Sequence, residues 1–176
     1  MSHKIGVGAP NQKILFKGIF DFDELYRVMH DWFMFRGYTL HETKYKLKAK
    51  DTGKEKEIQW QAWRKVNDIL KSWFKIHIQV WNIEPIEVVK DGEKKILTKA
   101  RLMIFVNGEV EIDYDDRFEG SKFKQALRDF LVSFVIKGKI DSVWGDKVQF
   151  MQYKLLDVIK QTLDMQIKGN EHFDVW

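Results

Sequence analysis

Aromatic and sulfur-containing side chains recur on the polar side of several expected strands, where they could bind a partner. Trp63, Trp73 and Trp81 point away from the apolar stripe of their strands and are interleaved with glutamine and lysine residues. A solvated sheet face rarely carries such rings, and contiguous exposed rings usually mark something bound. The candidate interface residues are Trp63, Trp73, His77, Trp81, Met103 and Phe105, together with Trp176 in the C-terminal tail.

Three interpretations of these rings stay open. The first is a protein interface, formed with a second copy of the chain or within a larger assembly, because Trp and Met are enriched in interface cores. The second is nucleic acid, because a ring can stack on an unpaired base for about 1–3 kcal/mol. The third is structural, with the N-terminal arm, the C-terminal tail or the last helix folded over the rings. The leading hypothesis is a non-catalytic interaction or structural protein.

Charge is distributed unevenly along the chain. Residues 42–75 contain ten Lys or Arg against five Asp or Glu, whereas residues 107–119 contain six carboxylates and one Arg. A basic surface attracts the phosphate backbone, so an RNA-associated protein is an alternative function. The basic-patch candidates are Lys44, Lys46, Lys48, Lys65 and Lys75.

The acidic stretch is a candidate cation site. Its carboxylates belong to Glu109, Glu111, Asp113, Asp115 and Asp116. Alternate residues on one strand face lie about 7 Å apart, near enough to share a hard cation through water. The glycine and ligand ladder of a calcium loop is missing, so we expect these carboxylates to face lysines on a neighbouring strand.

No arrangement of residues typical of catalysis stands out. The five histidines lack the paired spacing of a zinc site, and the chain has no cysteine. No nucleophile elbow or Ser-His-Asp order can be recognised. The sequence therefore predicts no cofactor, no metal and no catalytic residue, and it favours a protein that is not an enzyme.

The expected strands are organised around residues 100–114. Even-numbered positions there are apolar, beginning with Leu102, Ile104 and Val106, and odd-numbered positions are mostly polar. This alternation is typical of a strand with one buried face. Similar patterns predict strands over residues 13–20, 39–48, 57–66 and 70–83. Pro85 should break the sheet ladder, Asp91-Gly92 should form a hairpin turn, and Gly108 should mark a bulge or bend.

Three helices are expected. Asp21 and Glu24 predict the start of the first, which should end at Gly37, with Trp32 and Phe35 off its apolar stripe. A second helix is expected over residues 120–138 and a third over residues 146–167, each with one apolar face. The second should bury Phe123, Ala126, Leu127, Phe130, Leu131, Phe134 and Val135.

These elements predict an α+β fold in which helices cover one face of an antiparallel meander. Their order resembles the helix-grip arrangement, in which a curved sheet closes around a long C-terminal helix. That resemblance implies a second alternative function, a pocket for a small apolar ligand between sheet and helix, lined by Trp60, Phe74 and Leu155.

Length and composition bound the remaining expectations. With 176 residues, 44% of them hydrophobic, the chain can bury one core. We expect a flexible arm over residues 1–12, a single domain over residues 13–169 and a tail over residues 170–176. The first residues carry no apolar block like that of a secretory signal, and no apolar run is long enough to span a membrane. A cytoplasmic location is expected.

Overall fold

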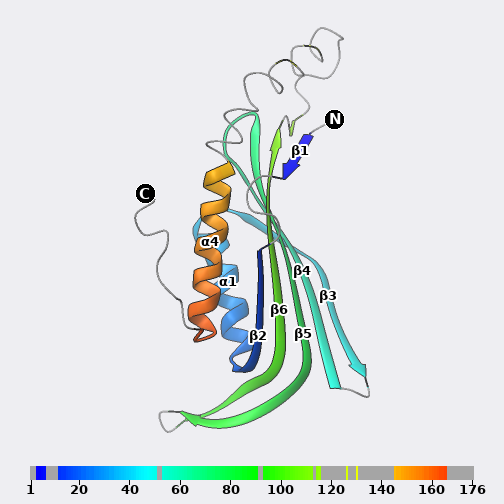
Figure 1. Cartoon of the computed structure of the whole chain (residues 1–176), viewed down its shortest axis with the longest axis vertical. Coiled ribbons are helices and arrows are strands. Elements are labelled where there is room, and N and C mark those ends of the chain that lie inside the picture. Colours follow the sequence, from blue (N-terminus) through cyan, green and yellow to red (C-terminus); the bar gives the residue numbers. More distant parts are fainter. Residues whose placement is uncertain are drawn as a thin grey trace.

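The computed structural model describes residues 3–6, 12–50, 53–90, 93–112, 114–115, 126, 130 and 145–165. Its strands are β1 (His3–Gly6), β2 (Gln12–Phe20), β3 (Thr39–Lys50), β4 (Gly53–Lys65), β5 (Leu70–Lys90) and β6 (Glu93–Ile112). Its long helices are α1 (Phe22–Phe35) and α4 (Gly145–Thr162) (Figure 1). The described residues thus form an α+β fold, as expected, with two helices where the sequence predicted three.

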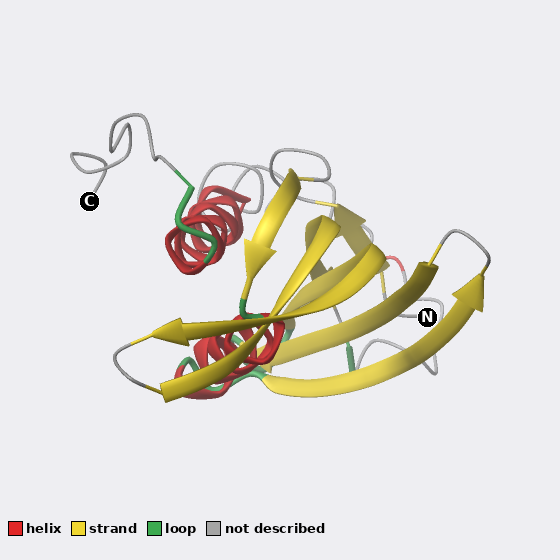
Figure 2. Cartoon of the chain, turned by 90° about the horizontal axis from the view of Figure 1, so that it is seen from below, coloured by secondary structure: helices red, strands yellow, loops and turns green. Residues whose placement is uncertain are grey.

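The six strands form one antiparallel sheet in the order β1-β6-β5-β4-β3, and β2 pairs with β6 beside β1. Strand β6 is central because β1 and β2 pair with its two halves along one side while β5 pairs along the other. Residues 3–6, which the sequence placed in a flexible arm, therefore form a strand. Seen from below, the sheet is strongly curved (Figure 2).

One face of the sheet is buried by the helices. The even-numbered residues of β4, of β5 as far as Val80 and of β6 from Ala100 onward lie on this inner face, as their alternation predicted. Helices α1 and α4 pack against each other and against the sheet. The buried apolar residues of this face on β4, β5 and β6 are Ile58, Trp60, Ala62, Leu70, Phe74, Ile76, Ile78, Val80, Ala100, Leu102, Ile104, Val106 and Val110.

Strands β5 and β6 continue past the rest of the sheet as a two-stranded arm. Strand β4 stops pairing with β5 at Ile83, and β2 stops pairing with β6 at Thr98. The arm curves beneath the lower end of α1 (Figure 1). The expectation that Pro85 breaks the ladder is wrong, because Pro85 pairs with Thr98. At this position β5 has a neighbour on one side only, so an absent amide hydrogen on the other side costs no hydrogen bond.

Two glycines occupy positions where a larger residue would be unfavourable. Gly37, with φ of 70°, follows α1 in the left-handed conformation expected of a helix terminus. Gly108 is not a bulge, since it pairs in register with Phe74. A Cβ atom there would lie 2.4 Å from Cγ1 of Val148 in α4. Gly108 is needed because the helix approaches the strand closely.

The expected second helix lies mostly outside the described residues. Ala126 and Phe130 are helical, but both are exposed, and Phe130 is 55% accessible. Their placement on a buried face is therefore wrong. Helix α4 buries Val148, Leu155 and Ile159 as expected. No helix among the described residues combines the length and apolar character that crossing a membrane requires.

Asp21 joins the start of α1 to the arm. Its Oδ1 accepts the Glu24 amide hydrogen at 3.0 Å, and its Oδ2 lies 2.7 Å from Nζ of Lys95. Partial burial raises the pKa of the carboxyl group, but the Lys95 ammonium and the backbone amides of Asp23 and Glu24 outweigh it, so the pKa is lowered. The ionised form of Asp21 therefore stabilises the folded state.

Replacing Asp21 with alanine is expected to lower the free energy of unfolding by about 0.5–2 kcal/mol, because the helix loses its cap. Asp21→Asn keeps a cap but loses the charge. Since the native pKa is below the usual 3.8, the charge stabilises the fold above that pH, and this contribution is lost as pH falls through the native value. Urea unfolding should show the gap between wild type and Asp21→Asn closing in acid. A gap independent of pH would contradict the assigned ion pair.

Candidate functional site

The outer face of the sheet, defined here as the face turned away from α1 and α4, contains the candidate interface residues. Strand register places Trp63 opposite Trp73, His77 opposite Phe105, and Trp81 opposite Arg101. Cross-strand partners in an antiparallel sheet point to the same side, so these residues and Met103 share one surface. Trp176 lies outside the described residues.

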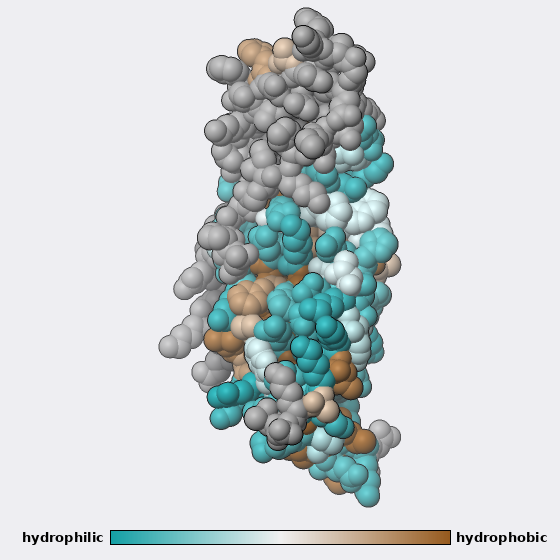
Figure 3. All heavy atoms as spheres, turned by 90° about the vertical axis from the view of Figure 1, so that its right-hand side faces the viewer, coloured by the Kyte–Doolittle hydropathy of each residue, from teal (hydrophilic) through white to brown (hydrophobic). Residues whose placement is uncertain are grey.

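The rings on this face are half-buried. Trp63, Trp73, Trp81, Met103 and Phe105 all have intermediate accessibility, between the exposed patch and the covered patch that the sequence left open. Lysine side chains lie against three of the rings, with Lys71 over Trp63 and Trp73 and Lys13 over Phe105. The side of the molecule away from α4 is accordingly mostly hydrophilic, with scattered hydrophobic areas (Figure 3).

Trp63 and Trp73 form the first aromatic cluster. Their ring centroids are 6.3 Å apart at an angle of 42°. The Lys71 ammonium lies 4.1 Å from the Trp63 centroid and 5.1 Å from that of Trp73. The Trp73 indole donates a hydrogen bond of 2.5 Å to Oε2 of Glu111. These contacts hold both indoles in place while leaving part of each ring accessible.

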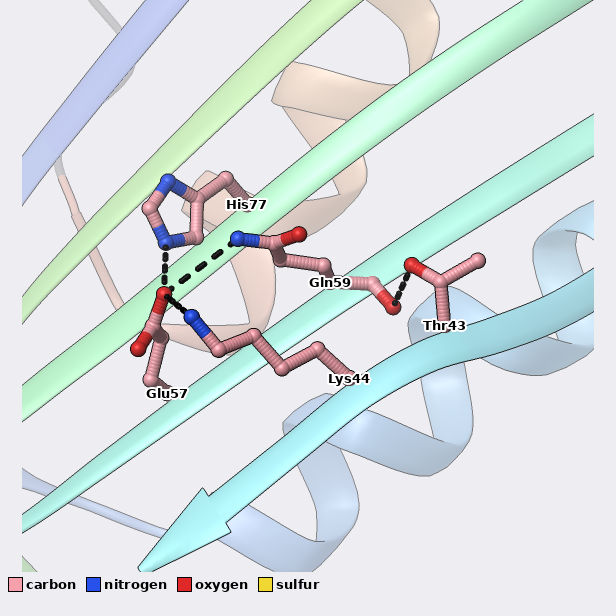
Figure 4. A network of polar contacts seen from close by, with 5 residues as sticks. All are labelled: Thr43, Lys44, Glu57, Gln59 and His77. Carbon is pink, nitrogen blue, oxygen red and sulfur yellow. Dashed lines mark hydrogen bonds and ion pairs between the residues drawn. The ribbon is translucent and has the colours of Figure 1, made fainter.

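His77 and Phe105 form a second cluster beside a polar network. Their rings stack at 24° with centroids 6.3 Å apart, and the Lys13 ammonium lies 5.5 Å from the Phe105 ring. Oε1 of Glu57 lies 2.6 Å from Nζ of Lys44 and 3.3 Å from Nε2 of His77 (Figure 4). The Lys44 hydrogen bond is the main reason that the pKa of Glu57 is lowered. Nε2 of His77 therefore lies beside a carboxylate whose pKa is lowered.

Trp81 borders a groove that crosses β5, β6 and β2. We call it the Trp81 groove, and its volume is about 590 Å³. Beside it, the pairing of β5 with β6 shifts between Trp81 and Glu84, and Asn82 has a left-handed φ of 55°. The residues that line the groove include Leu15, Phe16, Lys17, Trp81, Arg101 and Leu102.

The outer face carries an excess of positive charge. Of the basic-patch candidates, Lys44 and Lys75 form ion pairs with Glu57 and Glu109, whereas Lys46 and Lys48 are exposed on the edge strand β3. Lys65 lies over the ring of Tyr114. Apart from Lys95, whose ammonium is directed to Asp21 beside α1, register places ten cations on this face among the side chains that the structure describes, namely Lys13, Lys17, Lys44, Lys46, Lys48, Lys65, Lys71, Lys75, Lys99 and Arg101. It places five carboxylates there, those of Glu55, Glu57, Glu84, Glu109 and Glu111.

The acidic stretch is not a metal centre in the part of the chain that the structure describes. Glu109 lies 2.7 Å from Nζ of Lys75, and Glu111 stands opposite Lys71. The expectation that these carboxylates face lysines is therefore confirmed for both. Asp113 and Asp116 lie outside the described residues, within which no group of three or more ligands could hold a metal.

The three residues expected to line a helix-grip pocket belong to the core. Trp60, Phe74 and Leu155 are buried in one contiguous hydrophobic cluster. The Trp60 indole donates a hydrogen bond of 3.1 Å to Glu42, and its ring packs edge-on against Tyr26. The groove described above lies elsewhere and includes none of the three.

Sequence reasoning missed the contribution of β2 to the outer face. Lys13, Leu15 and Lys17 are exposed and alternate with the buried Ile14 and the half-buried Phe16, so their direction could have been found from the period of two. Their neighbours could not, because pairing of β2 with β6 brings Lys17 opposite Arg101 from 84 residues away. No protein-family model, no curated protein and no solved structure matches this chain.

Proposed function

We propose that this chain is a non-catalytic binding protein that docks single-stranded nucleic acid on the outer face of its sheet. The observation that carries the proposal is the coincidence, on one surface, of half-accessible rings and twice as many cations as carboxylates. Single-stranded nucleic acid offers the complementary chemistry, a row of negative phosphates and a row of unpaired bases.

The contacts suit this ligand. Lys71 lies over both indoles of the first cluster, so a base that stacks on Trp63 or Trp73 would displace the ammonium from the ring face toward the phosphate attached to that base. Lys13 has the same relation to Phe105. Stacking on a ring tolerates any base, and the lysines supply attraction without sequence preference. Binding should therefore be general in sequence and strongly dependent on salt.

Self-association through this face is less well supported. Two copies meeting through the same surface would bring its cations together, and like charges oppose such a contact. An acidic protein would satisfy the charge but would leave the rings without a stacking partner. The experiment described next also tests whether a protein partner binds this face instead.

Fluorescence anisotropy with a labelled single-stranded oligonucleotide of mixed sequence tests the proposal. Trp63→Ala should weaken binding about 5- to 150-fold, as expected for one lost stack. Lys71→Gln should lower the slope of log affinity against log salt by about one. The matched control is Phe35→Ala, which removes an exposed ring from α1, away from the sheet's outer face, and should change nothing.

Circular dichroism must first show that the variants are folded. Affinity that does not fall with salt, or that responds equally to Trp63→Ala and Phe35→Ala, would contradict the proposal. Size-exclusion chromatography with light scattering provides the other arm. A dimer that is dispersed by Trp63→Ala, in a protein that binds no oligonucleotide, would assign the face to self-association.

A further inference from the structure

The Trp81 groove is the part of the outer face best shaped for a discrete ligand. Its volume of about 590 Å³ falls within the range of small-molecule sites, roughly 300–1,000 Å³. Leu15, which is 59% accessible, and the half-buried indole of Trp81 provide apolar surface. Lys17 and Arg101 provide charge. The groove therefore suits an anion attached to an apolar or aromatic body.

The two cations of the groove face each other without a carboxylate. Lys17 and Arg101 are direct cross-strand partners, and like charges in that position repel. Neither forms an ion pair with any residue that the structure describes. The other cross-strand neighbour of Arg101 is Trp81, and Lys17 lies on an edge strand. By contrast, Lys44, Lys75 and Lys99 on the same face each have a carboxylate within 3.1 Å.

A bound anion would relieve this repulsion, and the charge indicates which anion. A phosphate monoester carries about −1.5 to −2 at neutral pH, which matches two cations. A carboxylate or an internal phosphodiester carries about one negative charge and would leave one cation unmatched. A guanidinium also binds phosphate through two parallel hydrogen bonds, a geometry that Arg101 can offer.

We propose that the Trp81 groove binds a terminal nucleotide, with its phosphate monoester between Lys17 and Arg101 and its base against Trp81. The inference rests on the proposed function and adds a preference for the phosphorylated end of a strand. The same chemistry is present in a free nucleoside monophosphate. The ligand is therefore defined by a planar base carrying a phosphate monoester, and the experiment separates the two sources.

Three oligonucleotides of one sequence test the inference, ending in a 5′-phosphate, a 3′-phosphate or hydroxyl groups only. One of the phosphorylated forms should bind at least about tenfold more tightly than the hydroxyl form, the ratio expected from one added charged hydrogen bond. Arg101→Met and Lys17→Met should each abolish that ratio. The control Lys48→Met, on the same face but distant from the groove, should weaken all three oligonucleotides equally and leave the ratio unchanged.

The failures of the two proposals can be distinguished. Equal affinity for all three oligonucleotides, with salt dependence retained, would overturn the groove assignment and leave the proposed function standing. If no oligonucleotide binds, the proposed function fails, and calorimetry with a nucleoside monophosphate then decides on the groove. Binding that Arg101→Met abolishes would support the groove site for the free nucleotide, and absence of binding would overturn it.

Discussion

Phe33→Ala is expected to lower the free energy of unfolding by about 3–5 kcal/mol, the usual cost of removing a buried phenyl ring. Phe33 has no accessible surface. Its ring centroid lies 5.0 Å from that of Trp32, 5.6 Å from that of Tyr38 and 5.8 Å from that of Phe74. The substitution would leave a cavity where α1 meets β5, because fixed backbone on both sides limits collapse. Urea unfolding followed by tryptophan fluorescence and far-ultraviolet circular dichroism measures the loss.

Phe35→Ala is the matched control, since the same side chain is removed from the same helix two residues away. Phe35 is 89% accessible, so its truncation should change the free energy of unfolding by no more than about 0.5 kcal/mol. Comparable losses for the two variants would contradict the assignment of the inner face of α1. A large loss for Phe35→Ala would show that this ring is covered in solution.

Gly108→Ala is expected to lower the free energy of unfolding by about 1–3 kcal/mol, the range for an overpacked core. The added methyl group would lie 2.4 Å from Val148 and 3.2 Å from the amide carbon of Gln152. Helix α4 would have to move away from β6. That movement would stretch the 3.4 Å hydrogen bond from Gln152 to the carbonyl oxygen of Val106.

A double-mutant cycle tests the cause of this loss. Val148→Ala removes the methyl groups that the new Cβ would strike, so the double variant should lose less stability than the sum of the two single variants. Gly18→Ala is the control, because its Cβ meets the end of the Phe16 ring, which is half-buried and can rotate. Additive losses for Gly108→Ala and Val148→Ala would refute the proposed close approach of α4.

Local patterns predicted the elements well where a single physical rule decides them. Asp21 caps α1 because its carboxylate reaches the amide of Glu24, a contact that needs only neighbouring residues. The strands follow from their alternation. The predictions for Pro85 and Gly108 were wrong because each depends on what lies beside the strand, an absent neighbour in one case and α4 in the other. Trp32 and Phe35 could not be separated by helical spacing, yet one is 5% and the other 89% accessible.

The sequence by itself determined which side chains share a strand face, because a period of two follows from backbone geometry alone. The sequence therefore indicated which rings lie on the outer face of the sheet and which apolar residues lie on its inner face. Only the tertiary structure decided which strands are neighbours, and hence that Lys71 lies over two indoles and that Lys17 meets Arg101. Lys17 and Arg101 lie 84 residues apart in the chain, and Lys71 reaches Trp63 from the neighbouring strand. Both contacts depend on strand order and register, which alternation within a single strand does not specify.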